Sequence, residues 1–130
     1  MRRLAFALLL AAGPALAQPA PVGFTAAQAE KGHELYGENC GACHGSVLEG
    51  SEFAPALKSG RFRRTHGGQT AGELLGYVTN NMPPGAAESL EPEEYAAILA
   101  YVMAQNGAAE GAAFPADPAS KAPLALPKAP

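Results

Sequence analysis

The stretch that decides the fold of this chain is Cys40-Gly41-Ala42-Cys43-His44. Its two thiols are three positions apart, so one helical turn brings both to the same side of the backbone. The histidine that follows can present an imidazole nitrogen beside them. C-x-x-C-H is the attachment spacing of c-type haem, in which the thiols form thioethers with the vinyl groups and the imidazole binds the iron. The motif predicts that the rest of the chain wraps, ligates or tunes one covalently bound haem.

Other sites built from two cysteines fit the sequence less well. A thioredoxin-like redox pair is expected in a βαβ context, and no alternating β-branched run surrounds the motif. A structural zinc site needs further Cys or His ligands, whereas the chain offers only His33 and His66 beyond the motif. A disulfide between Cys40 and Cys43 would close a very small loop and leave His44 without a role.

The composition favours a small domain that needs help from a cofactor. The chain has 130 residues, of which 48% are hydrophobic, but alanine makes up much of that share and there is no Trp. A core of alanine and a few leucines is thin, and small domains usually need an additional stabilising group. A covalently held haem would supply a large flat apolar surface for packing.

Residues 1–17 have the features of a secretory signal peptide. Arg2 and Arg3 precede an apolar run at 4–12, and Ala15-Leu16-Ala17 is a small-residue cleavage site. The apolar run is shorter than the roughly 20 residues that span a bilayer. We therefore expect cleavage after the motif, export to a bacterial periplasm and no stable membrane insertion of the mature chain.

The charge balance of the mature chain is negative. Without Arg2 and Arg3, seven basic side chains stand against twelve acidic ones, for a net charge of −5. This argues against nucleic acid or an anionic membrane as a partner. The one basic cluster is Arg61-Phe62-Arg63-Arg64, which could steer an acidic partner.

Capping patterns and apolar periodicity predict three main helices. They are expected over residues 26–39, about 71–79 and about 91–106. The first two follow the capping boxes Thr25-x-x-Gln28 and Thr70-x-x-Glu73. The third has Pro92 at its start and Asn106-Gly107 at its end. Residues 45–60 contain several Gly and Pro breakers and are predicted to form a loop around the haem, with at most one helical turn.

A second axial ligand is needed if the haem iron is to be six-coordinate. The candidates left after signal removal are Met82, Met103, His33 and His66. Met103 lies inside a predicted helix, where Met usually fills core space. Met82 precedes Pro83, which favours extended backbone for the residue before it, so its thioether could reach across the porphyrin face. We predict His44 and Met82 as the iron ligands, a pair that raises the reduction potential relative to two nitrogens.

These residues together resemble class I c-type cytochromes over roughly residues 26–107. The likeness rests on Gly32-x-x-x-Tyr36, Cys40-x-x-Cys43-His44, Pro55-x-Leu57, Met82-Pro83 and the closing helix 94–101. It implies a small all-α cytochrome c fold, in which three main helices and loops wrap one covalently bound haem c. It also implies that Gly32 and Tyr36 pack on Ile98 and Tyr101, where the first and last helices cross.

The resemblance implies roles for further residues around the haem. The carbonyl of Pro55 would accept a hydrogen bond from the second ring nitrogen of His44, and Leu57 would pack against the ring. Many relatives place a Trp against a haem propionate, but this chain has none, and Thr65-His66 stands at that point. The expected substitutes are His66, Arg61 and Arg64.

The implied division of the chain follows from these motifs. The segments are a signal peptide at 1–17, a loosely ordered lead-in at 18–24, a cytochrome c domain at 25–107 and an Ala/Pro-rich tail at 108–130, expected to be extended or disordered.

The implied function is that of a periplasmic one-electron carrier rather than an enzyme. Its expected partners are redox proteins, with a dehydrogenase as donor and an oxidase or another cytochrome as acceptor. Two alternatives stay open. One is a cytochrome c subunit of a quinoprotein dehydrogenase complex, tethered by the tail. The other is a haem gas sensor or peroxidase-like enzyme, in which Met82 leaves the iron.

Overall fold

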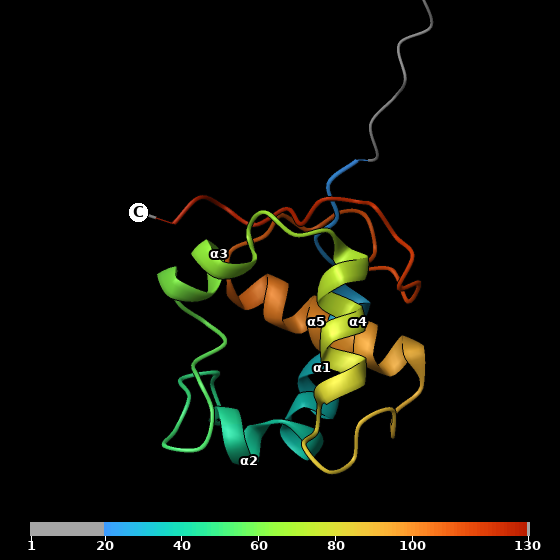
Figure 1. Cartoon of the computed structure of the whole chain (residues 1–130). Coiled ribbons are helices and arrows are strands. Elements are labelled where there is room, and N and C mark those ends of the chain that lie inside the picture. The colour runs from blue at the N-terminus through green and yellow to red at the C-terminus, as the bar shows by residue number, and fades with distance from the viewer. Residues whose placement is uncertain (1–19, 130) are drawn as a thin grey trace, which may run out of the picture.

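The computed structural model describes residues 20–129, so the expected signal peptide at 1–17 lies outside it. The helices are α1 (Ala26–Asn39), α2 (Gly41–His44), α3 (Gly60–His66), α4 (Ala71–Asn81) and α5 (Pro92–Gln105). Between residues 20 and 129 only isolated β-bridges form and there is no strand. The all-α prediction is confirmed, and α1, α4 and α5 are its three main helices (Figure 1). In this part of the chain no helix has the length and apolar character needed to cross a bilayer.

The predicted capping boxes begin α1 and α4, but α4 is longer than expected. Both the Thr25–Gln28 and the Thr70–Glu73 boxes are complete in the structure. The helix was predicted to end at about residue 79, whereas it continues to Asn81. The Met82 N–H still donates to the Val78 carbonyl at 2.8 Å, so only Pro83, which has no N–H, ends the pattern. Met82 is extended, as Pro83 predicts, with φ −125° and ψ 143°.

Helix α3 was not predicted. Its first residue, Gly60, was placed in the predicted loop at 45–60, and Arg61–Arg64 were identified only as a basic cluster. The Ser59 hydroxyl accepts a hydrogen bond from the Phe62 N–H at 3.0 Å, which caps the helix. Phe62 is buried. One N-cap and one buried aromatic side chain are therefore enough to hold two helical turns.

Among residues 20–129 the crossing of α1 and α5 is the most extensive helix–helix contact (Figure 1). A Cβ atom at Gly32 would collide with the Ala97 carbonyl of α5 and lie 3.0 Å from the Tyr101 Cβ. One turn further along α1, the rings of Tyr36 and Tyr101 lie 5.4 Å apart between centroids. The expected packing of the first helix on the last is confirmed, and glycine is required because the two backbones touch.

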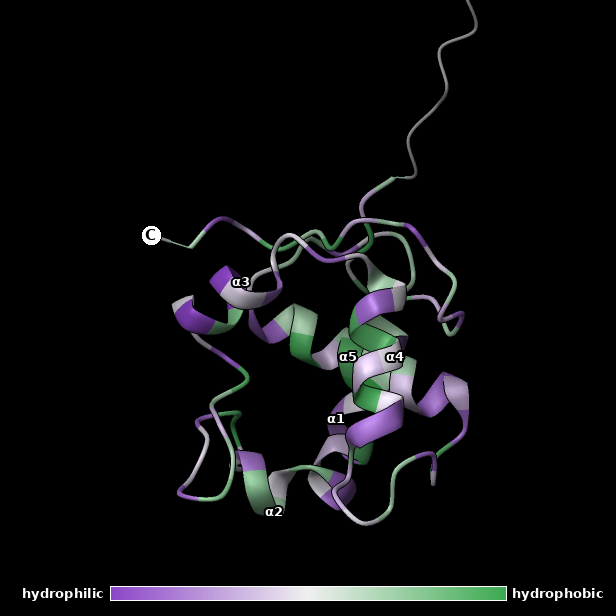
Figure 2. Cartoon of the chain, in the orientation of Figure 1, coloured by the Kyte–Doolittle hydropathy of each residue, from purple (hydrophilic) through white to green (hydrophobic). Residues whose placement is uncertain are grey.

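The hydrophobic core has two parts, on either side of α5. One joins α4, α5 and the terminal segments, and the other joins α1, α5 and the loop after α2. Figure 2 shows that α4 and α5 are hydrophobic over much of their length, and Leu74 and Leu75 of α4 belong to one buried cluster with Leu99 of α5. Met103 is fully buried in the first part, as expected for a methionine that fills core space.

The terminal segments are more ordered than predicted. The tail runs beside the residues before α1 and along the start of α4 (Figure 1). Val22 pairs with Leu124 in a parallel bridge, and the Gln28 side chain both donates to the Phe114 carbonyl at 2.8 Å and accepts from its N–H at 2.9 Å. Phe114 and Leu124 are buried. The tail is therefore extended, but it packs on the domain, because its few large apolar residues complete a thin core.

Replacement of Gly32 should separate the two central helices. Gly32→Ala puts a methyl group against the Ala97 carbonyl, so we expect a loss of about 1–3 kcal/mol in the free energy of unfolding. Gly37→Ala is the matched control, because nothing lies within 4 Å of a Cβ at Gly37 on the same helix. It should be neutral or stabilise by up to about 1 kcal/mol. Denaturant unfolding of both variants checks this, and similar values for the two would contradict the close contact.

Candidate functional site

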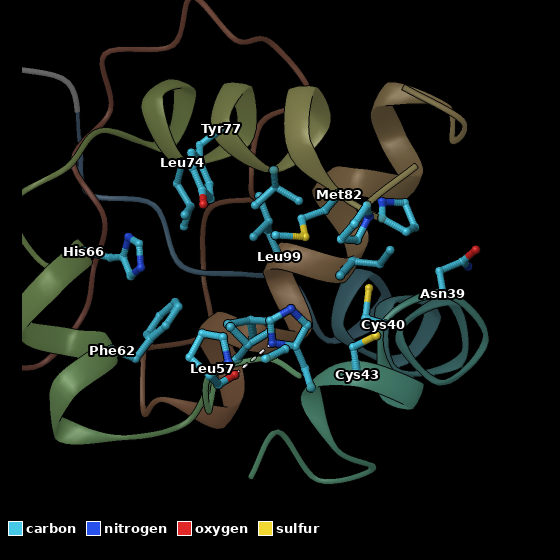
Figure 3. A pocket seen from close by; sticks show the side chains of 18 of the residues that line it. Asn39, Cys40, Cys43, Leu57, Phe62, His66, Leu74, Tyr77, Met82 and Leu99 are labelled. Carbon is cyan, nitrogen blue, oxygen red and sulfur yellow. Dashed lines mark hydrogen bonds between the residues drawn. The ribbon is translucent and has the colours of Figure 1, made fainter. Parts of the chain in front are cut away.

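A cavity of about 530 Å³ opens among α2, α3, α4 and α5 (Figure 3). Its volume falls within the roughly 300–1,000 Å³ typical of cofactor sites. The residues singled out from the sequence all line it, namely Cys40, Cys43, His44, Pro55, Leu57 and Met82. Apolar side chains of α4 and α5 supply much of the remaining wall, among them Leu74, Val78 and Leu99. The fold thus brings six residues from three segments of the chain to one apolar cavity.

The two cysteines stand next to each other at the edge of the cavity (Figure 3). The turn that presents them is helical, since the His44 N–H donates to the Cys40 carbonyl at 2.9 Å and the Gly45 N–H donates to the Gly41 carbonyl at 2.9 Å. Both are free thiols, with Cys40 half-buried and Cys43 exposed. Burial, helped by the neighbouring Cys43, raises the pKa of the Cys40 thiol to about 11.

The imidazole of His44 is buried and oriented by the loop that follows α2. With a proton on Nδ1, the ring donates a hydrogen bond of 2.8 Å to the Pro55 carbonyl, the contact expected from the resemblance. This bond selects the tautomer and leaves Nε2 as the nitrogen with a free lone pair. The same loop is tied to the turn by the Gly50 N–H, which donates to the His44 carbonyl at 2.7 Å.

Tyr36 holds the far side of the same turn. Its hydroxyl donates to the Gly45 carbonyl at 2.6 Å, and its own carbonyl accepts from the Cys40 N–H at 2.8 Å. The side chain is fully buried, and this burial raises the pKa of the Tyr36 phenol to about 12. The phenol therefore stays protonated, as a donor must. Gly45 has φ +84°, which glycine adopts without strain.

Met82 reaches the cavity from the segment after α4. Figure 3 shows its thioether pointing into the cavity, across from Leu57. The backbone of Met82 is held by Tyr95 of α5, whose hydroxyl donates to the Met82 carbonyl at 2.8 Å. Tyr95 is itself 1% exposed. The thioether thus comes from a segment that is anchored to the central helix.

Two positioning residues were missed from the sequence as site residues. Tyr95 was included only as part of the closing helix 94–101, and Asn106 was noted only as a helix stop. The buried Asn106 amide donates to the Leu57 carbonyl at 2.7 Å, and its oxygen accepts from the Ser59 N–H at 3.3 Å. These contacts fix the loop that carries Leu57 to the end of α5. A polar residue at a helix end gives no local signal of such a distant partner.

Among the three residues expected to replace the missing Trp, the structure separates one from the others. His66 lines the cavity, where its Nδ1 lies 2.8 Å from the Gln69 amide oxygen and its ring 4.6 Å from that of Phe62 (Figure 3). Arg61 and Arg64 do not line it. His33, the other histidine considered as a ligand, is exposed and stacks on Tyr101 with ring centroids 4.8 Å apart.

The residues present fit a covalently attached haem. The site combines two free thiols at its edge, an imidazole with one nitrogen hydrogen-bonded and the other free, a thioether and apolar walls. Thiols can form thioethers with vinyl groups, and imidazole and thioether are both ligands of haem iron. No residue lining the cavity is an Asp or Glu, so its walls suit a flat apolar group.

Comparison with known proteins identifies the family of this arrangement. The sequence profile of the family described as "Cytochrome C oxidase, cbb3-type, subunit III" matches residues 27–102. The match covers α2, α3 and α4 and most of α1 and α5.

Two curated relatives are similar in sequence to this chain over part of their own length. The Cbb3-type cytochrome c oxidase subunit CcoP of Rubrivivax gelatinosus is 34% identical over 80 residues, covering 59% of this chain and 26% of that protein. The quinohemoprotein alcohol dehydrogenase ADH IIB of Pseudomonas putida is 34% identical over 89 residues, covering 68% of this chain and 13% of that protein. The chain therefore corresponds to a small part of each of these larger proteins.

A solved structure shares the fold. The crystal structure of the sulfane dehydrogenase SoxCD from Paracoccus pantotrophus matches with a TM-score of 0.54 and 29% identity. The match covers 65% of this chain and 44% of that one.

Loss of the Tyr95 hydroxyl should loosen the segment that carries Met82. Tyr95→Phe removes the bond to the Met82 carbonyl, at a net cost of about 0.5–1.5 kcal/mol. In haem-loaded protein we expect methionine ligation to be lost at a lower temperature than in the parent. The transition can be monitored by the charge-transfer absorption band that a thioether ligand gives with ferric haem.

Tyr77→Phe is the control for this experiment. Tyr77 lines the same cavity but is 56% exposed, so the change should leave the transition where it is in the parent. An equal shift of the transition temperature in both variants would show that the Tyr95 hydroxyl does not stabilise the Met82 segment.

Proposed function

The chain belongs to the cytochrome c family described as cbb3-type cytochrome c oxidase subunit III, and on that basis we propose that it is a one-electron carrier. The family binds covalently attached haem c. Proteins of the family transfer electrons as cytochrome subunits of oxidase and dehydrogenase complexes. The observation that carries the proposal is the meeting of Cys40, Cys43, His44 and Met82 at one apolar cavity.

We assign Cys40 and Cys43 as the residues to which a haem would be attached, and His44 and Met82 as the residues that would bind its iron. When bound at this site, a haem supplies one-electron exchange between Fe(III) and Fe(II). The Pro55 carbonyl keeps the His44 imidazole in one tautomer and orientation. Tyr95 keeps the Met82 segment in place. If both residues bind the iron, the protein leaves no position for a substrate, which favours electron transfer over catalysis.

The walls of the cavity supply a low-polarity environment. Leu57 and Leu99 line it together with side chains of α3 and α4, and apolar walls exclude water and favour the less charged, reduced state of the site. His66 is the one titratable wall residue on α3, and we assign it, with Gln69, to the polar edge of the cofactor. Its bond to Gln69 fixes the ring orientation.

We place the mature protein in a bacterial periplasm. The support is the signal-like segment at 1–17, together with the family. Its donors and acceptors are redox proteins, and we propose a dehydrogenase on the donor side and an oxidase or another cytochrome on the acceptor side. The relatives that share this domain are named as an oxidase subunit and an alcohol dehydrogenase.

A second candidate is a cytochrome subunit bound stably within a quinoprotein dehydrogenase. The similarity to ADH IIB over 68% of this chain favours it. In size-exclusion chromatography of a native extract, a freely diffusing carrier should elute at the size of the isolated chain. A subunit should instead elute at a larger size, together with a dehydrogenase in constant stoichiometry.

Carbon monoxide binding tests the proposed ligation. The reduced, haem-loaded protein should bind carbon monoxide slowly and incompletely at neutral pH, because Met82 occupies the iron. Met82→Leu should bind it rapidly and fully. Met103→Leu is the matched control, since Met103 is buried in the core away from the cavity, and such a volume-conserving change should cost less than about 1.5 kcal/mol. Rapid, complete binding by the parent would instead support the gas-sensor or peroxidase-like alternative.

A further inference from the structure

Helix α3 presents one face to the cavity and others to solvent. Phe62, Thr65 and His66 line the cavity, and their i, i+3, i+4 spacing places them on one face of the helix. Arg61, Arg63 and Arg64 do not line it. The arginines therefore lie on the remaining sides of a short helix whose other side lines the cofactor site. Figure 2 shows most of α3 as hydrophilic, in contrast to α4 and α5.

The region around α3 is positive in a chain that is otherwise negative. Mature protein would carry seven basic and twelve acidic side chains. Three of the basic ones are Arg61, Arg63 and Arg64, and no Asp or Glu occurs between residues 53 and 72. The acidic residues all lie on other parts of the chain. We call Arg61, Arg63 and Arg64 the α3 arginine surface.

The α3 arginine surface has no internal counter-charge in the described part of the chain. Within residues 20–129 the one ion pair is Lys31–Glu34, on α1. A Cβ at Gly60 would lie 3.3 Å from Nη1 of Arg64 and 4.0 Å from Nη2 of Arg63, so two guanidinium groups gather at one point. The Nε of Arg63 is buried without a hydrogen-bond partner. Guanidinium groups gathered in this way create a local positive field, which attracts carboxylates.

We propose that the α3 arginine surface is the docking site for an acidic patch on a redox partner protein. The proposal rests on the proposed function, because the site matters only if electrons pass through the adjacent cavity. Guanidinium groups bind carboxylates in paired, directional hydrogen bonds. Exposed charge pairs are screened by salt, which suits fast and brief association. The surface belongs to the same helix that carries the wall residues Phe62 and His66, so a partner bound there lies next to the cofactor site.

Small charged oxidants test the local charge at the point of electron exit. The reduced, haem-loaded protein is oxidised either by hexacyanoferrate(III), an anion, or by tris(1,10-phenanthroline)cobalt(III), a cation. One electron passes to each oxidant, and no bond is made or broken. If the α3 arginine surface governs the encounter, the rate constant with the anion should fall about tenfold between roughly 10 and 200 mM salt, despite the negative net charge. The rate constant with the cation should not fall.

Two double variants localise the effect. In Arg61→Gln/Arg64→Gln the rate constant with the anion should no longer fall as salt is added. In Lys31→Gln/Lys121→Gln it should fall as in the parent. Both change the net charge equally and replace exposed side chains. A decaglutamate peptide should slow oxidation of the parent by hexacyanoferrate(III) and have no effect on the arginine variant. Arg63 is left unchanged because its Nε is buried.

The outcomes distinguish failure of the proposed function from failure of the docking site alone. Protein without covalent haem, or unable to react with either oxidant, would overturn the proposed function and the docking site with it. Protein that reacts with both oxidants, but with an anion rate that rises with salt or that responds equally to the two double variants, would overturn the docking site alone. The docking site is supported if the rate constant with the anion falls with salt in the parent and in the lysine variant but not in the arginine variant.

Discussion

The turn that carries Cys40, Cys43 and His44 is held by hydrogen bonds from residues outside it, and the site depends on this restraint. Tyr36 donates to the Gly45 carbonyl at 2.6 Å on one side, and the Pro55 carbonyl lies 2.8 Å from the His44 Nδ1 on the other. A ligand histidine whose second nitrogen is fixed has a defined tautomer, orientation and basicity. Tyr36 is in turn buried where α1 crosses α5, and that crossing is possible because residue 32 has no side chain. A backbone contact between two helices thus determines how the imidazole is presented.

The remaining architecture follows from a large cavity inside a small domain. The two parts of the hydrophobic core lie on either side of α5, and the cavity of about 530 Å³ lies beside them. The tail adds Phe114 and Leu124 to the core from a segment otherwise rich in Ala and Pro. The cofactor would complete the packing, so folding stability and haem content are expected to be linked.

Local features were predictable from the sequence, and distant contacts were not. The boxes at Thr25 and Thr70 gave correct helix starts because a cap and its partner are three residues apart. The C-x-x-C-H motif and Met82-Pro83 pointed to residues that the structure brings to one cavity. By contrast, the Gln28–Phe114 and Asn106–Leu57 bonds join residues far apart in the chain, and neither leaves a local pattern. Helix α3 was missed because glycines at its ends outweighed its single cap at Ser59.

The central claim is that Cys40 and Cys43 attach a haem whose iron is bound by His44. Mass spectrometry of the purified, exported protein tests this most directly. The account predicts that the intact mass exceeds that of the processed chain by one haem, that the added mass stays on the proteolytic peptide containing Cys40–His44, and that neither thiol reacts with iodoacetamide. A peptide of unmodified mass with both thiols alkylated, from protein matured in a host able to attach haem, would contradict it.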